Sequence, residues 1–332
     1  MNNTILLSIC IPTYNRAQYL NQTIQSIVDS NGFGDQVEII ISDNCSTDNT
    51  EIVCKKWINK YKNIKYYKQI KPTNIADQNF IDALTLGTGQ YLKLNNDTVL
   101  FRRETVQYML NVIKDNVNMK NPLFFYNNYK KHINTYMICD TSDSFLREVS
   151  FRTMWIPLFG CWKKDFNKIQ QKTRFIDLQL MQVDWTFQIV SQKKAVINFF
   201  ELYDIFELKN KSGGYNIFKV FSQNYLNILK FFVQKKELSE RAYNIEKKKL
   251  LFNYLIPRYI MSVLQQKSYN FNNDSKFKYL KDYKRDWYFY VALSLILPYF
   301  IIYTFVFLAR KISAKNIKLY NFLRRIKVRI GI

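Results

Sequence analysis

Residues Ser8–Arg16 read SICIPTYNR, an apolar run that stops at a proline and continues with hydroxyl, amide and cationic side chains. A short, continuous apolar run is typical of a strand that is buried on both faces of a sheet. Two later segments repeat the pattern, EIIISDNCSTDNT at Glu38–Thr50 and GQYLKLNNDTVL at Gly89–Leu100. The three segments therefore predict buried strands with polar loops at their carboxyl ends.

Amphipathic stretches separate these runs within the first hundred residues. We expect strands at Ile5–Ile11, Val37–Ser42, Ile64–Lys68 and Gln90–Leu94, and helices at Gln18–Val28, Asp48–Tyr61 and Asn74–Leu86. Strands that alternate with helices at this spacing predict right-handed βαβ units and a parallel sheet. Ligands of such sheets bind at the carboxyl ends of the strands, so the chemistry is expected in the loops after Ile11, Ser42 and Leu94.

Two common phosphate-binding motifs are missing from the sequence. No glycine-rich dinucleotide fingerprint follows the first strand, and no phosphate loop with a lysine is present. The strand ends instead offer carboxylates and amides, which suit ribose, base edges and a divalent metal. This indicates a nucleotide that is bound through its base and sugar, with a cation neutralising its phosphates.

The pattern is less regular beyond residue 115. We expect strands at Leu123–Tyr129 and Ile133–Ile138 and a helix around Ile176–Val190. The composition shifts near Ser212–Gly214, and from Ile217 onward the chain reads as helices. We therefore expect an α/β domain at residues 1–210 and a helical region at residues 211–332.

Cysteine and histidine usage favours neither a zinc site nor a disulfide framework. The five cysteines show no paired short spacing, and His132 is the single histidine, interpreted here as a surface residue. A reducing cytoplasm is the natural compartment for such a chain. The start MNNTILLSIC lacks the basic residues and long apolar run of a secretory signal, so we do not expect export.

The motifs, in their order and spacing, resemble those of bacterial family 2 glycosyltransferases of the GT-A fold. The resemblance covers about 100 residues and rests on Ser8–Arg16, Glu38–Thr50, the helix start at Asn74 to Phe80, and Gly89–Leu100. It implies a Rossmann-like α/β domain with a mostly parallel central sheet. Within that domain, residues 1–110 would bind the nucleotide sugar and residues 111–210 would form the acceptor side.

A later segment is similar to a narrower group of these enzymes. Gly213–Asn216 reads GGYN, which recurs in sugar transferases of O-antigen, lipooligosaccharide or capsule assembly, abequosyltransferase-like proteins among them. The resemblance therefore implies transfer of a sugar from a nucleotide-diphosphate sugar, with inversion, to a glycan or lipid-linked glycan acceptor in surface polysaccharide biosynthesis.

The resemblance also assigns a set of residues to the donor nucleotide. They are Pro12, Tyr14, Asn15, Arg16, Asp43, Asn79 and Asn96. Asp43 directly follows a strand at the ligand-binding edge, which favours contact with the base or ribose over turn formation. Asp48 precedes a helix, where an oxygen side chain satisfies free N–H groups, so capping is the favoured interpretation there.

The acidic metal motif of the family falls on Asn95-Asn96-Asp97. Two carboxylates in an Asp-x-Asp arrangement hold a divalent cation, Mn²⁺ or Mg²⁺, against the diphosphate. Asn95 offers only a neutral oxygen, so metal binding should rest on Asp97. The alternative is that Asp97 only stabilises a turn.

An inverting transfer needs a general base for the proton of the acceptor hydroxyl. The resemblance places this carboxylate 80 to 100 residues after the metal motif, which selects Asp184. Asp177 lies seven residues earlier, on the same face of the expected helix, and is the alternative. A solvated or salt-bridged role remains open for both. Trp155, Trp162 and Trp185 are either an acceptor-sugar platform or part of the core.

The formal net charge of +23 lies in the second part of the chain. Residues 1–100 contain 9 basic and 9 acidic side chains, and residues 310–332 contain eight basic side chains and no acidic one. Residues 287–309 are uncharged and long enough to span a bilayer, or to form a hairpin broken at Pro298. This placement favours attachment to the inner-membrane surface at its cytoplasmic face over nucleic-acid binding. A non-catalytic nucleotide-sugar binder or scaffold is the other functional alternative.

Overall fold

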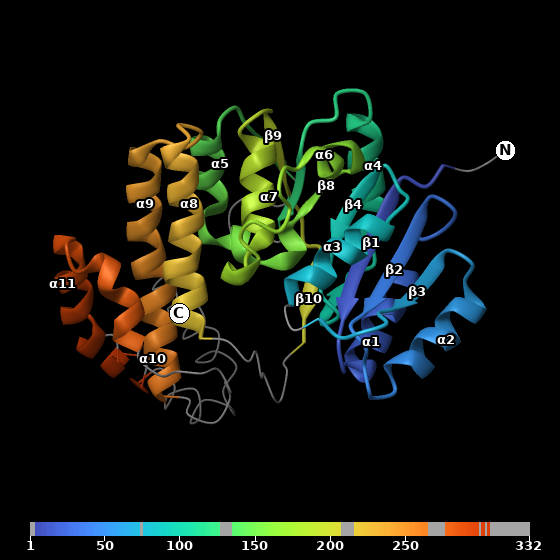
Figure 1. Ribbon diagram of the computed structural model, residues 1–332, viewed down its shortest axis with the longest axis horizontal. Coiled ribbons are helices and arrows are strands. Elements are labelled where there is room, and N and C mark those ends of the chain that lie inside the picture. Colours follow the sequence, from blue (N-terminus) through green and yellow to red (C-terminus); the bar gives the residue numbers. More distant parts are fainter. Residues whose placement is uncertain are drawn as a thin grey trace, which may run out of the picture. The chain divides into compact units, whose positions relative to one another are not determined.

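The computed structural model describes residues 4–73, 76–126, 135–206, 216–264, 276–298, 300–302 and 304–305. The chain forms two compact units (Figure 1). The first comprises Met1–Glu207 and Ile228–Ser239, and the second comprises Leu208–Asn227 and Glu240–Ile332.

A five-stranded sheet of order β3-β2-β1-β4-β8 forms the centre of the first unit (Figure 1). Its strands are β1 (Leu7–Thr13), β2 (Val37–Asp43), β3 (Ile64–Lys68), β4 (Tyr91–Leu94) and β8 (Gly160–Trp162). The first four run parallel, and β8 pairs with β4 antiparallel. The α/β fold with a mostly parallel sheet is therefore confirmed.

Apolar side chains cover both faces of β1 and β2, and helices pack on each face. Ile9, Ile11 and Ile39 lie in one core, and Cys10 and Ile40 lie in the other. The first core also holds α1 (Ala17–Val28), α2 (Thr50–Lys60) and α4 (Thr105–Asn116). The second holds α3 (Ala76–Leu86), α6 (Lys163–Lys168) and α7 (Met181–Val190).

Two smaller sheets complete the first unit. One pairs β5 (Val99–Phe101) with β10 (Tyr203–Ile205), and the other has the order β6-β9-β7, formed by Leu123–Tyr126, Ala195–Phe199 and Thr135–Cys139. Four short helices also belong to this unit, namely α5 (Ser142–Val149), η1 (Ser150–Met154), η2 (Ile156–Leu158) and η3 (Ile176–Leu178).

The second unit is helical in its described part. Its elements are η4 (Lys219–Asn224), α9 (Glu240–Leu250), η5 (Leu251–Leu255), α10 (Ile256–Leu264), η6 (Lys276–Tyr283) and α11 (Trp287–Ser294). Helix α8 (Tyr225–Gln234) begins in this unit and continues into the first. The phenol of Tyr225 donates a hydrogen bond to buried Glu246 at 3.0 Å.

The expected strands and helices of the first hundred residues lie within two residues of those observed wherever the structure describes their ends. The single helix expected at Ile176–Val190 is wrong. Gln179 has a φ of 60°, in the left-handed region, and separates η3 from α7. Asp177 and Asp184 therefore do not share a helix face. His132, Asn74, residues 213–215 and the basic tail at 310–332 lie outside the described residues.

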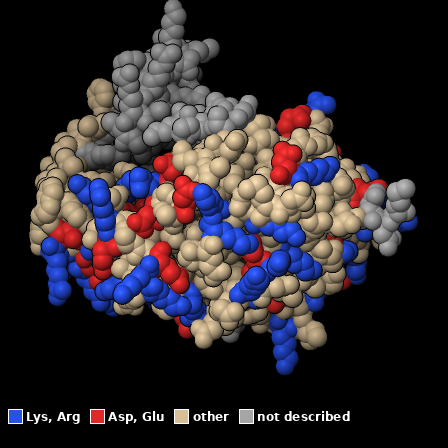
Figure 2. Space-filling view, turned by 90° about the horizontal axis from the view of Figure 1, so that it is seen from above, with Lys and Arg blue, Asp and Glu red and all other residues tan. Residues whose placement is uncertain are grey.

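The uncharged span at residues 287–309 does not begin as one long helix, because α11 ends at Ser294. Over the residues that the structure describes, no helix is long and apolar enough to cross a membrane. On the face drawn in Figure 2, Lys and Arg side chains are interspersed with Asp and Glu.

Candidate functional site

Three loops meet at the carboxyl edge of the central sheet because β1, β2 and β4 are adjacent and parallel. Thr13 and Asp43 are register partners at the ends of β1 and β2. The backbone N–H of Asn95 donates to the carbonyl of Cys10 at 2.9 Å, which continues the pairing of β4 with β1. The polar residues that follow each strand are thus brought together at one edge.

Asp97 is held by side chains from the first loop. Its Oδ2 accepts a hydrogen bond from the Thr13 hydroxyl at 2.9 Å, and its Oδ1 lies 3.5 Å from the guanidinium of Arg16. Thr23 of α1 donates to the Asp97 carbonyl at 3.0 Å. Burial raises the pKa of Asp97, although Arg16 and Thr13 act in the opposite direction. The carboxylate is oriented by residues 81 and 84 positions away in the sequence.

Asn95 presents a buried amide oxygen at the same edge. Its Nδ2 donates to the Asn96 carbonyl at 2.9 Å, whereas its Oδ1 has no hydrogen-bond partner among the described residues. A buried polar atom without a partner is unfavourable, and an amide oxygen is a suitable ligand for a hard divalent cation. One carboxylate and one amide therefore fit a cation here, although the described residues contain no cluster of three His, Cys, Asp or Glu that could hold one.

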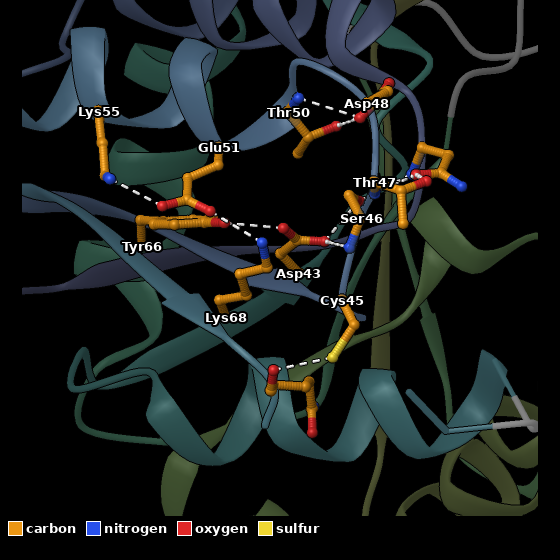
Figure 3. A network of polar contacts seen from close by, with 12 residues as sticks. Asp43, Cys45, Ser46, Thr47, Asp48, Thr50, Glu51, Lys55, Tyr66 and Lys68 are labelled. Carbon is orange, nitrogen blue, oxygen red and sulfur yellow. Dashed lines mark hydrogen bonds and ion pairs between the residues drawn. The ribbon is translucent and has the colours of Figure 1, made fainter. Parts of the chain in front are cut away.

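Asp43 lies at the centre of a polar network at the end of β2 (Figure 3). Its Oδ1 accepts from the Ser46 N–H at 2.9 Å and from the Ser46 hydroxyl at 2.5 Å, and its Oδ2 accepts from the Tyr66 phenol at 2.8 Å. Burial, together with the hydrogen bond to Asp43, raises the pKa of Tyr66. The carboxylate is fully buried. The hydrogen bonds of Asp43 therefore fix the conformation of the loop after β2 from the protein interior.

Asn15 joins the first loop to the second. Its φ of 51° is in the left-handed region, which asparagine tolerates better than most residues. Its N–H donates to the Ser46 hydroxyl, and its Oδ1 accepts from the Thr47 N–H, both at 2.8 Å. Beside it, the Tyr14 side chain is half exposed and Arg16 is partly exposed, while Pro12 is partly buried.

Asp48 caps two helices. Its Oδ2 accepts from the Ala17 N–H at the start of α1, and its Oδ1 accepts from the Thr50 N–H at the start of α2, each at 3.0 Å. Burial would raise the pKa of Asp48, but the hydrogen bonds from Thr50 and Ala17 outweigh it, so the pKa lies below its ordinary value. The capping interpretation of Asp48 is confirmed.

Asn79 links α3 to the ends of β1 and β2 through buried hydrogen bonds. Its Nδ2 donates to the Ser42 carbonyl at 2.9 Å and to the Thr13 carbonyl at 3.4 Å, and its Oδ1 accepts from the Ser42 hydroxyl at 2.6 Å. The side chain is 3% exposed. Asn79 thus lies at the predicted edge but is occupied with the backbone of β1 and β2. Asn96 lies between Asn95 and Asp97 and is partly buried.

The two predicted bases differ in their surroundings. Asp184, in the first turn of α7, is 1% exposed and forms an ion pair with Arg174, while Gln188 donates to its Oδ2 at 2.9 Å. Burial raises the pKa of Asp184, and Arg174 and Gln188 act against that effect. The Arg174 guanidinium in turn lies over the ring of Phe231 at 4.3 Å. Asp177, in η3, is exposed to solvent.

The family model "Glycosyl transferase family 2" matches residues 8–180, which is more than half of the chain and includes the whole carboxyl edge. The chain belongs to glycosyl transferase family 2. The resemblance seen in the four motifs is thereby confirmed.

Curated relatives match short parts of this family 2 chain. It is 40% identical to abequosyltransferase RfbV of Salmonella typhimurium over 87 residues, 26% of each chain. It is 28% identical to the minor teichoic acid biosynthesis protein GgaB of Bacillus subtilis over 123 residues, 36% of this chain and 13% of GgaB. The chain thus spans about a quarter of RfbV and a smaller part of GgaB.

A solved structure shares the fold over a longer range. The S. aureus TarS fragment 1–349 in complex with UDP aligns with a TM-score of 0.57 at 14% identity, covering 79% of this chain and 75% of that one. At this identity the likeness shows the fold alone.

Two of the three tryptophans considered as a sugar platform in this family 2 protein belong to its core. Trp162 and Trp185 are buried, and their indole N–H groups donate to the carbonyls of Asn121 at 2.7 Å and Lys172 at 3.0 Å. A platform role for these two is therefore wrong, because neither ring is accessible. Trp155 is partly buried and packs edge-on against Tyr203 at 5.7 Å.

Sequence reasoning missed three residues at or beside the edge. Thr13 orients Asp97, and the visible signal was a hydroxyl side chain at the end of the first apolar run. Lys93 is fully buried in β4, where it donates to the carbonyls of Leu94, Pro157 and Phe159, and burial lowers its pKa to about 7. A lysine inside the apolar run YLKL was the visible signal. Asp77 of α3 had no signal, because its partner lies 104 residues away.

Proposed function

We propose that this chain transfers a sugar from a nucleotide-diphosphate sugar to a hydroxyl of a growing bacterial surface glycan, at the cytoplasmic face of the inner membrane. The observation that carries the proposal is the convergence of Asp97, Asn95, Thr13 and Arg16 at the carboxyl edge of a family 2 sheet. The names of the relatives support the setting, since RfbV is an abequosyltransferase and GgaB acts in teichoic acid biosynthesis.

The donor lies with its base and ribose over the loops after β1 and β2. Tyr14, half exposed, offers an aromatic face, and the partly exposed Arg16 offers a cation toward a phosphate. Asp43, Asn79 and Asn15 act indirectly, since their hydrogen bonds fix the backbone of both loops. The fold has accommodated such a ligand in another protein, because TarS was crystallised with UDP and with UDP-GlcNAc.

A divalent cation, Mg²⁺ or Mn²⁺, would be held by Asp97 and the Asn95 amide oxygen, and would neutralise the charge of the leaving nucleoside diphosphate. Thr13 and Arg16 keep the Asp97 carboxylate oriented. Since one of the two usual carboxylates is an amide here, the site carries less negative charge and should bind the ion more weakly than a site with two carboxylates.

Transfer proceeds by direct displacement with inversion. The acceptor oxygen forms a bond to the anomeric carbon, the bond from that carbon to the diphosphate oxygen breaks, and the diphosphate leaves with the electron pair. A carboxylate takes the proton of the acceptor hydroxyl. Of the two predicted bases, Asp177 is exposed to solvent, which supports it as the base, whereas Asp184 is enclosed in its pair with Arg174. We assign the base to Asp177 and an ion-pair role to Asp184.

Attachment to the membrane rests on the second unit. Trp287, Tyr290, Leu297, Ile301 and Phe305 are at least 60% exposed, and no charged residue interrupts the sequence from Trp287 to Phe305. Such a surface, with aromatic side chains and lysines beside it, suits the interface of a bilayer. Lys248 lies 5.3 Å from the centre of the Trp287 ring.

The test is a ligand screen followed by a transfer assay. Thermal unfolding is measured with uridine, guanosine, cytidine and thymidine diphosphates and their sugars, with and without Mn²⁺. We expect one nucleotide to raise the unfolding temperature, more so with Mn²⁺, and its sugar to be transferred. Stabilisation without transfer by any preparation would favour the non-catalytic binder, and no stabilisation by any compound would refute the assignment.

A further inference from the structure

Helices α3 and α7 lie on the same face of the central sheet. Phe80, Ala83 and Leu84 of α3 share one core with Met181 and Trp185 of α7, although about a hundred residues separate them in the sequence. Helix α3 follows β3, so its first turn lies at the carboxyl edge where the candidate site is. A contact between the first turns of the two helices shows that α7 starts at this edge as well.

That contact is made by Asp77. Its Oδ2 accepts a hydrogen bond at 3.2 Å from the N–H of Met181, the first residue of α7. Leu180, which precedes the helix, has an apolar side chain and cannot cap it. An unpaired N–H at a helix start needs an acceptor, and the helix dipole favours an anion there. Asp77, 4% exposed, therefore supplies from α3 the cap that α7 lacks.

Helix α3 also binds the strand ends that precede the donor loops, through Asn79, two residues after Asp77. Asn79 binds the carbonyls of Ser42 and Thr13, and the Thr13 side chain binds Asp97. The first turn of α3 thus touches the donor side of the site through Asn79 and the start of α7 through Asp77. Directly before α7 comes η3, which carries the exposed Asp177.

We propose that Asp77 is a positioning residue, which fixes the first turn of α7 and the acceptor side of the site relative to the donor-binding strand ends. The kinetic consequence rests on the proposed function, whereas the contact does not. Burial raises the pKa of Asp77 to about 6, and the Met181 N–H acts against that rise. An acceptor oxygen at this place is what the role requires, and asparagine would also provide one.

The experiment compares Asp77→Ala with Asp77→Asn in the full chain. Alanine removes the acceptor, so amide hydrogen exchange in the first turn of α7 should become at least about tenfold faster, as expected for a helix start that frays. A misplaced acceptor side should lower kcat by about 10- to 100-fold. Affinity for the nucleoside diphosphate should stay within about twofold, and Asp77→Asn should restore most of the activity.

Asp143→Ala is the matched control. Asp143 also accepts a hydrogen bond from a distant backbone N–H, that of Ser239 at 2.9 Å, but it lies in α5, outside the candidate site. This variant should keep both kcat and the exchange rates of α7. A similar fall of kcat in both alanine variants would indicate general loosening and overturn the proposal.

Three other outcomes also decide against it. Unchanged kcat in Asp77→Ala would show that the contact has no part in turnover. A parallel loss of nucleotide affinity would place Asp77 in the donor site. If Asp77→Asn were as inactive as the alanine variant, the carboxylate itself would take part in the chemistry. Absence of transfer by the unmodified chain would refute the proposed function, while hydrogen exchange would still test the contact.

Discussion

At the residue scale, Asp97 is the side chain on which donor binding should depend most directly under the proposed function. Asp97→Asn keeps the shape and can still accept from Thr13, but it removes the charge that a cation needs. We expect transfer to fall by at least about 100-fold, the range for loss of one strong electrostatic contact at a reacting centre. Mn²⁺ should no longer strengthen nucleotide binding, which calorimetric titration measures directly.

The unfolding temperature of Asp97→Asn shows whether a loss of transfer reflects lost function or lost folding. Burial raises the pKa of Asp97, so folding disfavours its charged form, and the neutral amide should leave the unfolding temperature unchanged or raise it. Asp115→Asn, at an exposed position of α4, serves as the control with full activity. If Asp97→Asn retained its dependence on Mn²⁺, Asp97 would not be a ligand of the cation.

Asp177 and Asp184 should respond to the same substitution in opposite ways. Asp177→Asn removes an exposed carboxylate, so we expect transfer to be lost at an unchanged unfolding temperature. Asp184→Asn leaves Arg174, whose side chain is 13% exposed, without its ionic partner, and should lower the free energy of unfolding by about 3 kcal/mol. Urea denaturation and a transfer assay on both variants measure the difference. Full activity of Asp177→Asn would return the assignment to Asp184.

At the element scale, Glu38 of β2 joins its strand to β1, to β3 and to the turn before β4. Its carboxylate accepts from Ser8 at 2.6 Å, from the Thr88 N–H at 2.5 Å and from Lys65 at 2.7 Å, and it is 1% exposed. Burial would raise the pKa of Glu38, but hydrogen bonds from Lys65, Ser8 and Thr88 outweigh it, so the pKa is lowered. Its contribution to stability is therefore present above the ordinary value of 4.5 and is lost as the pH falls through the lower folded value.

Glu38→Gln should accordingly cost about 2 kcal/mol at pH 7, the scale of hydrogen bonds to a charged group. The difference from the unmodified chain should shrink below pH 4.5, and denaturant unfolding at several pH values measures it. Glu51→Gln is the comparison, because Glu51 also binds lysines, Lys55 and Lys68, but at the surface. Its effect on stability should be much smaller than that of Glu38→Gln, because solvent screens an ion pair at the surface. A pH-independent difference for Glu38→Gln would show that its charge has no role.

How far the sequence predicts the structure also differs among elements. The strands β1, β2 and β4 follow from continuous apolar runs, because burial on both faces leaves a pattern that is local in the sequence. The break at Gln179 has no such pattern, since a left-handed residue other than glycine leaves no signal in composition. The burial of Asp184 depends on Arg174 and on rings from α8, which only tertiary packing brings together.

The candidate site shows the same division. Polar residues after strand ends are visible in the sequence and do lie at one edge, because the topology of parallel strands requires it. Which of them are exposed was not predictable. Asp43 and Asn79 are enclosed by hydrogen bonds, whereas Tyr14 and Arg16 remain accessible. The sequence thus locates the edge, and packing decides which side chains a ligand can touch.

At the scale of the whole molecule, the separation of charge and apolar surface predicts where the chain acts. The neutral first hundred residues contain the edge proposed to bind the donor, and the basic residues accumulate later, on either side of the uncharged span. We expect the full chain to sediment with vesicles that contain phosphatidylglycerol, more than with pure phosphatidylcholine, and less as salt is raised, because the basic side chains are attracted to anionic headgroups.

The exposed apolar side chains of the second unit should contribute independently of charge. Replacing Trp287, Tyr290 and Leu297 together by serine removes three large exposed side chains without disturbing the buried Phe289, so vesicle binding should fall at every salt concentration while transfer to a soluble acceptor persists. Ile70→Ser is the matched control, since Ile70 is 97% exposed in the first unit. If the triple variant bound vesicles as tightly as the unmodified chain, the apolar surface would have a partner other than the membrane. Light scattering would then show whether that partner is a second copy of the chain.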